Sequence, residues 1–493
     1  MSRYVLSIDQ STSASKAFLV DEQGGIVKKA SLAHRQYYPA PGFVEHDARE
    51  IWENVVRVLA DVSQGIAAED IAALSISNQR ETTVLWDRVT GEPVCPALVW
   101  QDTRAQKLCD EISSHAQDIW QRTGLALSPY YSAAKAAWVL NSDPKLMARA
   151  QAGEILIGTV DSYLIYRLSG NRAHLTDVSN ASRTQLMNLE DLCWDEQVCA
   201  WFDIPRRCLP DILPSDHVFT QVSCEGLPKG IPVCGVMGDS HAALFGQGCV
   251  SPGMAKATYG TGSSVMMHTG SRPVRSKHGL SSCVGFGFAG ETAYVLEGNI
   301  TCSGDTLVWL SKELGLISDP AEAEELAKTV PDAQGVYLVP AFAGLGAPRF
   351  DSEARAILCG MSRGTTRAHV ARAALESIAY QECDIVSAMQ NDSGCTLSTL
   401  RADGGGSRNA LLMQFQADLL HCTIACAAQS ELSALGAAYM GGISAGLFGS
   451  LNEIPAYRQQ GARYAPAMGE ARRGQLLQGW ADAVERTRSK TIR

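Results

Sequence analysis

The sequence predicts an α/β fold of two similar domains that face one central cleft. The chain opens with a β-rich run over residues 4–8, a polar turn over 9–15 and a second β-like run over 17–20. The same order of strand, small polar turn and strand returns over residues 254–268, directly after a Gly/Pro-rich stretch over 246–253. Two such turns between strands indicate duplicated α/β units, and the Gly/Pro-rich stretch indicates a hinge between them. A length of 493 residues allows this division.

The first domain is predicted over residues 1–246. After the opening hairpin, a helix is predicted over 48–66, because apolar residues recur on one of its faces: Ile51, Trp52, Val55, Val58 and Leu59. A strand pair over 71–77 and 82–86 follows, joined by the polar corner 78–81. Further elements are two helical segments, 102–118 and 132–152, and an apolar strand, 231–236.

The second domain is predicted over residues 254–455, followed by a C-terminal surface extension over 456–493. Within this domain the loop 403–407, Asp-Gly-Gly-Gly-Ser, precedes a helix over 410–420. Three adjacent glycines let the backbone approach a flat ligand, and the N-terminus of the following helix favours phosphate. The polar extension carries an amphipathic helix near 475–484.

The composition is that of a globular protein without a polyanion-binding surface. Hydrophobic residues make up 46% and charged residues 19% of the chain, and the formal net charge is −10. This charge argues against a nucleic-acid partner, which would need a basic face. The fifteen cysteines include no Cys-x-x-Cys pair, so free thiols are expected rather than zinc or disulfides. Without a leader or an apolar run near about 20 residues, we expect a cytoplasmic protein with no membrane span.

The common nucleotide-binding signatures do not fit. No G-x-x-x-x-G-K-[ST] is present, which excludes a P-loop enzyme. One G-x-G-x-x-G occurs at Gly285, Gly287 and Gly290, but a strand-like run follows it where a dinucleotide site requires a helix. We therefore expect a hairpin turn there.

Four clusters have a chemical rationale for phosphate and metal binding. Residues 9–13, Asp-Gln-Ser-Thr-Ser, and 260–263, Gly-Thr-Gly-Ser, are turns that can present backbone N–H groups to phosphate. Asp9 could also hold Mg²⁺ through water. Asp239 follows an apolar strand, at the end where α/β sheets bind ligands, and the loop 403–407 is the fourth cluster. Taken singly, each also has a purely structural explanation: a solvated turn for 9–13 and 260–263, a plain loop for 403–407 and a helix N-cap for Asp239.

Taken together, the motifs resemble those of the FGGY carbohydrate kinases, in particular the glycerol kinase branch. The resemblance covers about residues 4 to 450. The matching motifs are 75–82 (Ser-Ile-Ser-Asn-Gln-Arg-Glu-Thr), 99–101 (Val-Trp-Gln), 123–125 (Thr-Gly-Leu), 129–130 (Pro-Tyr), 238–239 (Gly-Asp), 242–247 (Ala-Ala-Leu-Phe-Gly-Gln), 259–262 (Tyr-Gly-Thr-Gly), 339–342 (Val-Pro-Ala-Phe), 344–348 (Gly-Leu-Gly-Ala-Pro), 374–381 (Ala-Leu-Glu-Ser-Ile-Ala-Tyr-Gln) and 435–438 (Leu-Gly-Ala-Ala).

The resemblance implies an actin-like ATPase (ribonuclease H-like) fold and an ATP-dependent kinase that phosphorylates a hydroxyl of a small polyol or sugar. It implies that Asp239 is the catalytic base, and that Asp9 and Asp239 hold Mg²⁺. The implied acceptor-binding residues are Arg80, Glu81, Trp100, Tyr130, Asp239, Ser240 and Ser264. The implied ATP-binding residues are Thr12, Ser13, Lys16, Thr261, Gly304, Gly405 and Asn409. We also expect a homo-oligomer, either a dimer or a tetramer.

Two departures from the glycerol kinase pattern concern the acceptor. Ser240 stands where those proteins have Gln directly after the base, and Ser264 stands where they have a Phe that lines the carbon skeleton. Both serines are smaller, and the second is also polar where Phe is apolar. We therefore expect a roomier, more polar pocket and an acceptor larger than glycerol. Glycerol itself is the alternative acceptor.

The other departures concern the nucleotide. Ser11, Ala14 and Lys16 stand where glycerol kinases have Gly, Ser and Arg, and Val308 stands where they have Gln. Lysine still supplies positive charge, but as a single ammonium group rather than the bidentate guanidinium of arginine.

Two alternatives from other classes share the fold: a non-catalytic ATP-binding sensor, and an ATP-driven chaperone or filament protein without a small acceptor. The Arg80-Glu81 corner argues for an acceptor site, because the pair offers the donors and acceptors that a diol needs.

Overall fold

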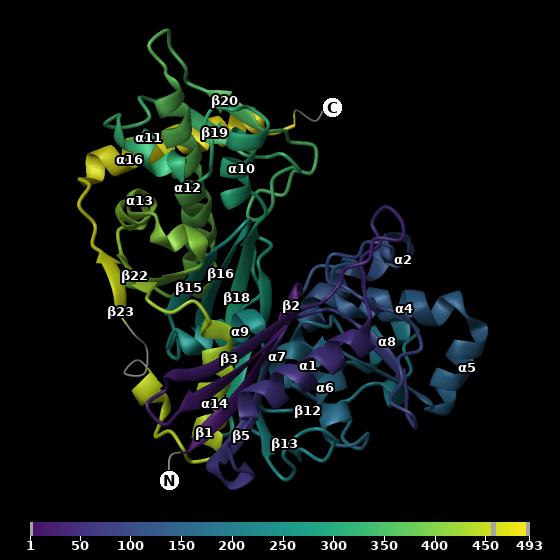
Figure 1. Cartoon of the computed structure of the whole chain (residues 1–493). Coiled ribbons are helices and arrows are strands. Elements are labelled where there is room, and N and C mark those ends of the chain that lie inside the picture. The colour runs from purple at the N-terminus through teal and green to yellow at the C-terminus, as the bar shows by residue number, and fades with distance from the viewer. Residues whose placement is uncertain (1–2, 455–459, 490–493) are drawn as a thin grey trace.

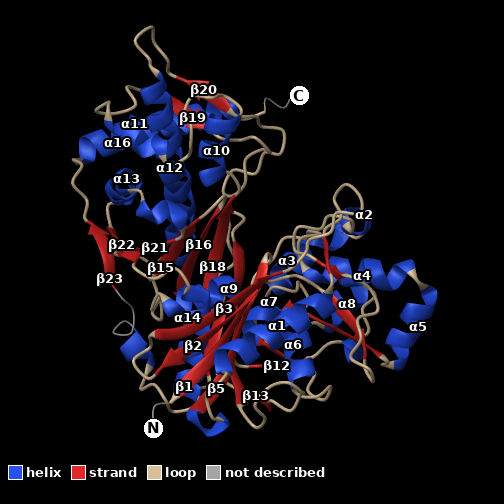
Figure 2. Cartoon of the chain, viewed as in Figure 1, coloured by secondary structure: helices blue, strands red, loops and turns tan. Residues whose placement is uncertain are grey.

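The computed structural model describes residues 3–454 and 460–489, which form two lobes (Figure 1). Each lobe is built around one mixed β-sheet (Figure 2). The predicted α/β fold of two similar domains is confirmed, since both lobes open with an antiparallel hairpin whose first strand also pairs parallel with a later strand.

The first sheet has six strands in the order β13-β14-β5-β1-β2-β3. Strands β14, β5 and β1 run parallel, whereas β13, β2 and β3 pair antiparallel with their neighbours. Because three parallel strands end at one edge, the side chains that follow them meet there. The strands are β1 (Tyr4–Gln10), β2 (Ala14–Asp21), β3 (Ile26–Ala33), β5 (Ile71–Asn78), β13 (Val218–Gln221) and β14 (Pro232–Gly238).

The second sheet has seven strands in the order β17-β18-β16-β15-β21-β22-β23. Strands β15, β21 and β22 run parallel, and the remaining neighbours pair antiparallel. The G-x-G-x-x-G segment forms the β17–β18 hairpin, as expected, with Gly290 in its turn at φ 82°. The strands are β15 (Ala255–Tyr259), β16 (Ser263–Gly270), β17 (Ser281–Phe288), β18 (Glu291–Ile300), β21 (Thr399–Asp403), β22 (Thr423–Ala427) and β23 (Gln460–Tyr464).

Helices cover both faces of the first sheet. Helices α1 (Ala48–Ser63) and α6 (Val160–Leu168) bury apolar residues against one face, and α9 (Asp239–Gly246) and α14 (Leu432–Ser444) cover the other. Helix α14 lies beside β1 and β5 although it comes late in the chain (Figure 1). It crosses α9 so closely that a Cβ on Gly436 would lie 1.8 Å from the Ala242 carbonyl oxygen. This contact between α9 and α14 joins the N-terminal and C-terminal halves of the chain. The domain boundary at residue 246 remains a prediction.

The second lobe packs around the long helix α12 (Arg367–Ser393), with α13 (Ala410–Leu420) and the C-terminal α16 (Glu470–Thr487). Part of the predicted C-terminal surface extension lies outside the described residues. Its helix α16 reaches into the core, because Trp480 is 3% exposed and stacks on Tyr380 with ring centroids 5.0 Å apart. This helix is therefore not only a surface layer.

Three local predictions need correction. The strands expected over 71–77 and 82–86 do not pair with each other, because β5 joins the first sheet and β6 (Val84–Asp87) pairs with β8 (Ile155–Gly158). The helix expected over 132–152 is two helices, α4 (Ser132–Ser142) and α5 (Pro144–Ala152). Asp143 ends the first and caps the second, with Pro144 at its first position. The segment 102–118 is likewise divided, into α2 (Gln106–Glu111) and the start of α3 (Ala116–Thr123).

Shorter elements complete the lobes: α7 (Val178–Ser182), α8 (Glu196–Trp201), α10 (Gly304–Lys312), α11 (Glu322–Lys328), β4 (Glu45–His46), β7 (Ala97–Leu98), β9 (Leu175–Asp177), β10 (Met187–Asn188), β11 (Cys193–Trp194), β12 (Asp211–Leu213), β19 (Tyr337–Val339) and β20 (Ile357–Cys359). Within residues 3–454 and 460–489, no helix combines the length and the apolar character needed to cross a bilayer.

Candidate active site

Three sequence-predicted side chains meet at the carboxyl edge of the first sheet. Asp9 is the next-to-last residue of β1, and Arg80 follows β5. Asp239 follows β14 as the first residue of α9. Gly238 makes this approach possible, since a Cβ at that position would lie 2.6 Å from the Arg80 side chain. The parallel order β14-β5-β1 therefore gathers an Arg and two carboxylates from distant parts of the sequence.

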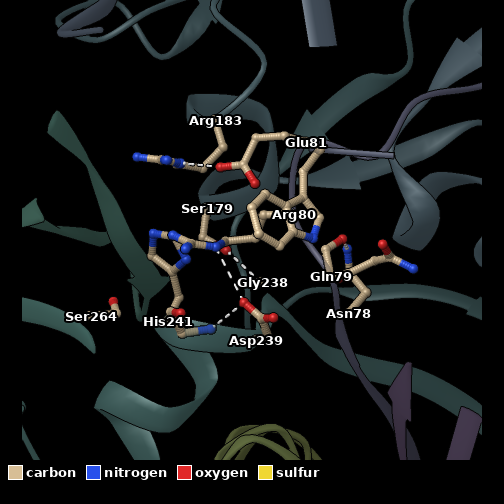
Figure 3. A network of polar contacts seen from close by, with 12 residues as sticks. Asn78, Gln79, Arg80, Glu81, Ser179, Arg183, Gly238, Asp239, His241 and Ser264 are labelled. Atoms are coloured by element: carbon tan, nitrogen blue, oxygen red, sulfur yellow. Dashed lines mark hydrogen bonds and ion pairs between the residues drawn. The ribbon is translucent and has the colours of Figure 1, made fainter. Parts of the chain in front are cut away.

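One carboxylate oxygen of Asp239 is held and the other is free. Oδ1 accepts a 2.6 Å hydrogen bond from the Ser240 backbone N–H and lies 3.2 Å from Arg80 Nε. Asp239 and Arg80 point toward each other in Figure 3. Oδ2 accepts no hydrogen bond from the part of the chain that the structure describes, and the side chain is 36% exposed. This oxygen is available to a ligand.

A buried ion-pair network holds Arg80. Its Nη1 and Nη2 donate to the two oxygens of Glu297, both at 2.8 Å. Arg183 donates from Nε to Glu81 at 2.6 Å and lies 3.0 Å from Glu297 (Figure 3 shows the Arg183–Glu81 pair). Burial alone would raise the pKa of Glu297, but Arg80 and Arg183 outweigh it and hold the pKa well below its ordinary value. The network keeps Arg80 and Glu81 in one orientation.

An aromatic wall closes one side of this site. Trp100 and Tyr130 meet edge to face, with ring centroids 5.7 Å apart. Trp100 also donates from Nε1 to Thr12 Oγ1 at 3.0 Å, so the wall is joined to the first hairpin turn. Burial raises the pKa of Tyr130 well above its ordinary value, so its hydroxyl stays a neutral donor and acceptor. The predicted acceptor residues Arg80, Glu81, Trp100 and Tyr130 thus lie together.

Asp9 and Lys16 face each other across the β1–β2 hairpin. They are register partners, with Lys16 Nζ 3.6 Å from Asp9 Oδ2. Lys16 also donates to Glu431 at 3.1 Å, a partner from the second half of the chain. Burial raises the pKa of Asp9 to about 6; Lys16 opposes the rise, and the carboxylate of Asp239 adds to it. A cation beside Asp9 would offset the repulsion that the carboxylate of Asp239 exerts on it.

The carboxylates of Asp9 and Asp239 fit a magnesium ion in one respect. Mg²⁺ is usually held by one or two carboxylates together with waters and ligand phosphates rather than by a cage of protein side chains. Among the described residues there is no group of three or more His, Cys, Asp or Glu that could hold a metal alone. Asp9 and Asp239 therefore match a site that a phosphate ligand would complete.

A separate cavity of about 410 Å³ lies in the second lobe. Four predicted nucleotide residues line it: Thr261, Gly304, Gly405 and Asn409. The glycine-rich loop passes against β15, since a Cβ on Gly404, at φ 85°, would lie 2.4 Å from the Tyr259 carbonyl oxygen. The departure Val308 lies in the wall as well. The predicted residues Thr12 and Ser13 belong instead to the turn of the first hairpin.

Ser264 lies on the second lobe but reaches the Arg80 network. Its Oγ donates to Glu297 Oε1 at 3.3 Å, the same oxygen that accepts from Arg80 Nη2. Ser240, whose backbone N–H binds Oδ1 of Asp239, is half-buried. Of the two serines that depart from the glycerol kinase pattern, Ser264 thus contacts the ion-pair network of Arg80, and Ser240 directly follows Asp239 in the chain.

Sequence reasoning missed Glu297, Arg183 and Glu431. Glu297 is an acid in an otherwise apolar strand segment, Tyr-Val-Leu-Glu over 294–297, which is a weak signal that a buried partner exists. Its partner Arg80 lies 217 residues away, so no local motif contains the pair. Glu431 likewise meets Lys16 over a separation of 415 residues.

Comparisons with known proteins agree on one family. The family model described as "FGGY family of carbohydrate kinases, N-terminal domain" matches residues 4–246, and the corresponding C-terminal domain matches residues 255–445. "Glycerol kinase 2" of Thermotoga maritima is 46% identical, covering 98% of this chain and 99% of the relative. "Glycerol kinase" of Dechloromonas aromatica is 48% identical, covering 98% and 97%.

Solved structures extend the comparison. Plasmodium falciparum glycerol kinase with ADP has a TM-score of 0.95 and 36% identity, and the match covers 99% of both chains. Gluconate kinase of Lactobacillus acidophilus has a TM-score of 0.88 at 22% identity, covering 98% of this chain and 97% of the other, which shows a common fold.

Proposed function

Because the chain belongs to the FGGY family of carbohydrate kinases, phosphotransferases with an alcohol group as acceptor, we propose that it transfers the γ-phosphate of ATP to a hydroxyl of glycerol. The observation that carries the proposal is the half-exposed Asp239 with one free carboxylate oxygen beside Arg80. Relatives named glycerol kinase, at 46% and 48% identity over nearly the whole chain, favour glycerol over the larger acceptor expected from the sequence.

The acceptor would lie between Arg80, Glu81 and the wall of Trp100 and Tyr130. Three of the five N–H groups of Arg80 are used by Glu297 and Asp239, which leaves two for hydroxyl oxygens. One oxygen of Glu81 accepts from Arg183, and the other can accept from a hydroxyl. A vicinal diol needs this combination of donor and acceptor, and the rings offer an apolar surface to its carbons.

Asp239 would act as the general base through Oδ2. Because Oδ1 is held by Arg80 and Ser240, the free oxygen can face the acceptor hydroxyl and take its proton. The alcohol oxygen forms a bond to the γ-phosphorus while the bond from that phosphorus to the β–γ bridging oxygen breaks. ADP leaves with that electron pair, and Asp239 keeps the proton. Mg²⁺ held at Asp9 and Asp239 would supply positive charge to the phosphate oxygens.

ATP would span both lobes. The cavity lined by Thr261, Gly304, Gly405 and Asn409 suits a nucleoside, and the hairpin turn with Thr12, Ser13 and Lys16 suits the terminal phosphates. The similar structure of a glycerol kinase with ADP supports this assignment. Phosphoryl transfer asks the protein mainly for such alignment and charge neutralisation.

The test is acceptor-dependent ADP release by the purified full-length protein. With Mg²⁺ and ATP, glycerol should accelerate ADP formation, and phosphorus NMR should show one phosphomonoester product. Omission of the acceptor is the control for ATP hydrolysis. If neither glycerol nor any other polyol or sugar accelerates ADP release, the proposal is wrong and the non-catalytic sensor becomes the better hypothesis.

A longer polyol or a sugar is the second candidate acceptor. Ser240 and Ser264 support it, because Ser240 directly follows Asp239, Ser264 contacts the ion-pair network of Arg80, and both are smaller than the Gln and Phe of glycerol kinases. The same ADP assay, run with acceptors of three to seven carbons, ranks the two candidates by kcat/KM. A cytoplasmic homo-oligomer, either a dimer or a tetramer, remains a further expectation.

A further inference from the structure

One face of strands β16 and β18 points away from the core of the second lobe. Side chains alternate along a strand, and Leu296 and Ile300 of β18 are buried in that core. Glu297 and Asn299 lie at the alternate positions between Leu296 and Ile300, so their side chains point to the opposite face. This opposite face is turned toward the first lobe, because Glu297 accepts a hydrogen bond from Arg80 of that lobe.

The far part of this face is closed by helix α9. Val295 of β18 and Met266 of β16 are buried against Leu244, which lies in the second half of α9. The first residue of the same helix is Asp239. The part of the face that continues past Glu297 therefore lies toward the Asp239 end of the helix, where the proposed chemistry takes place.

Ser264 and Asn299 sit opposite each other on this part of the face. They are register partners in the antiparallel β16–β18 pair. Residues in such a pair share one face and have Cβ atoms about 5 Å apart. Ser264 is half-buried, whereas Asn299 is exposed and its amide has no hydrogen-bond partner within residues 3–454 and 460–489.

The hydrogen-bonding capacity of the two side chains is complementary. Ser264 Oγ uses its single hydrogen on Glu297, so it faces the cleft as an acceptor only. The Asn299 amide group offers two N–H donors. One alcohol hydroxyl is both a donor and an acceptor, and it can donate to Ser264 while accepting from Asn299.

We propose that Ser264 and Asn299 form an acceptor subsite that binds a hydroxyl beyond the three carbons held next to Asp239, and that this kinase therefore also takes polyols of four to six carbons. The proposal rests on the proposed kinase function and extends its acceptor range. Ser264 contacts Oε1 of Glu297, the same oxygen contacts the Arg80 guanidinium, and that guanidinium contacts Asp239. Because only these two groups separate Ser264 from Asp239, one acceptor can contact both residues. Glycerol fills the inner part and leaves the subsite to water.

The test compares acceptors in the full-length protein and in Asn299→Ala. Steady-state kcat/KM is measured with glycerol and with erythritol, threitol, ribitol, xylitol and sorbitol. The parent protein should phosphorylate at least one of the longer polyols. In Asn299→Ala, kcat/KM for that polyol should fall at least about tenfold further than kcat/KM for glycerol, because the extra hydroxyl loses its donor. Asn299→Asp, which removes the donors and keeps the shape, should behave as Asn299→Ala does.

Asn391→Ala is the matched control. Asn391 lies exposed on α12, so the same substitution there should leave the ratio of the longer polyol to glycerol unchanged. Melting temperatures of all variants show whether they fold alike. If glycerol is phosphorylated and no longer polyol is, or if Asn299→Ala leaves the ratio within about twofold, the subsite is wrong and the kinase function stands. If no acceptor at all stimulates ADP release, both the subsite and the proposed function are wrong.

Discussion

Arg80 and Glu297 form a two-pronged salt bridge between the two lobes, with both N–O distances at 2.8 Å. Arg80 follows β5 of the first sheet, and Glu297 belongs to β18 of the second. Both side chains are almost fully buried, at 7% and 0% exposure. The pair fixes the guanidinium whose Nε contacts Asp239, so a residue of the second lobe helps to set the position of the proposed base in the first.

Glu297→Gln should weaken both stability and catalysis. The amide keeps the shape but leaves Arg80 and Arg183 buried with one fewer counter-charge, and breaking a buried pair typically destabilises by about 3–5 kcal/mol. Urea unfolding measures the stability. Because Arg80 loses its orientation, kcat should fall and the acceptor KM should rise while the ATP KM changes little. A Glu297→Gln protein with parental kinetics and stability would contradict the positioning role.

Asp239→Asn should leave ATP binding nearly intact and reduce kcat by about 10²–10⁴-fold. The amide has the size and shape of the carboxylate, so the contacts made by Oδ1 can be kept. It cannot accept the proton of the acceptor hydroxyl. Calorimetric titration with a non-hydrolysable ATP analogue measures binding, and ADP release measures turnover. More than half of the parental turnover in this variant would exclude Asp239 as the base.

The stability of the protein should fall as pH rises through the neutral range, in part because of Glu382. Burial raises the pKa of this carboxyl to about 8, from an ordinary value of 4.5. The folded state then binds a proton that the unfolded state has lost between these two values, so unfolding becomes easier as pH rises, on the order of 1 kcal/mol per pH unit for this one group.

Glu382→Gln should remove this contribution. The free energy of unfolding, measured by urea at pH 6 and pH 8, should then decrease less with pH than in the parent. Glu313→Gln, at an exposed position, is the matched control and should leave the slope unchanged. An identical slope in Glu382→Gln and the parent would show that Glu382 is ionised in the folded protein at neutral pH.

The double variant Ser240→Gln and Ser264→Phe should shift acceptor preference toward glycerol. The two larger side chains would fill the space beside Arg80 and Asp239, and the phenyl ring would remove the Ser264 hydroxyl from Glu297. The ratio of kcat/KM for a longer polyol to that for glycerol should fall at least about tenfold, which is about 1.4 kcal/mol. An unchanged ratio would mean that neither serine contacts the acceptor.

ATP and acceptor together should bring the two lobes closer. The two hairpin turns lie in different lobes, so a ligand that spans both favours a closed form that excludes water. Small-angle scattering with glycerol and a non-hydrolysable ATP analogue should give a smaller radius of gyration than the free protein. An unchanged radius would argue against a hinge at residues 246–253.

Local patterns were enough to predict the class of fold and much of the site. The opening hairpin and the similar unit over 254–268 were visible as strand, polar turn and strand, because turn residues and strand periodicity act over a few positions. The strand-end position of Asp239 was readable for the same reason. The resemblance to the FGGY kinases then assigned roles to residues whose proximity no local pattern contains.

The tertiary structure alone decided which of these residues meet. Glu297 reaches Arg80, Ser264 reaches Glu297, and Asn299 stands opposite Ser264 only because two sheets far apart in sequence face each other. Helix α14 covers the first sheet for a similar reason, with Ser7 Oγ bonded to the Ala434 carbonyl across 427 residues. Such contacts depend on the packing of whole layers, whereas the sequence pattern of a strand shows only that one face is buried and not what lies against it.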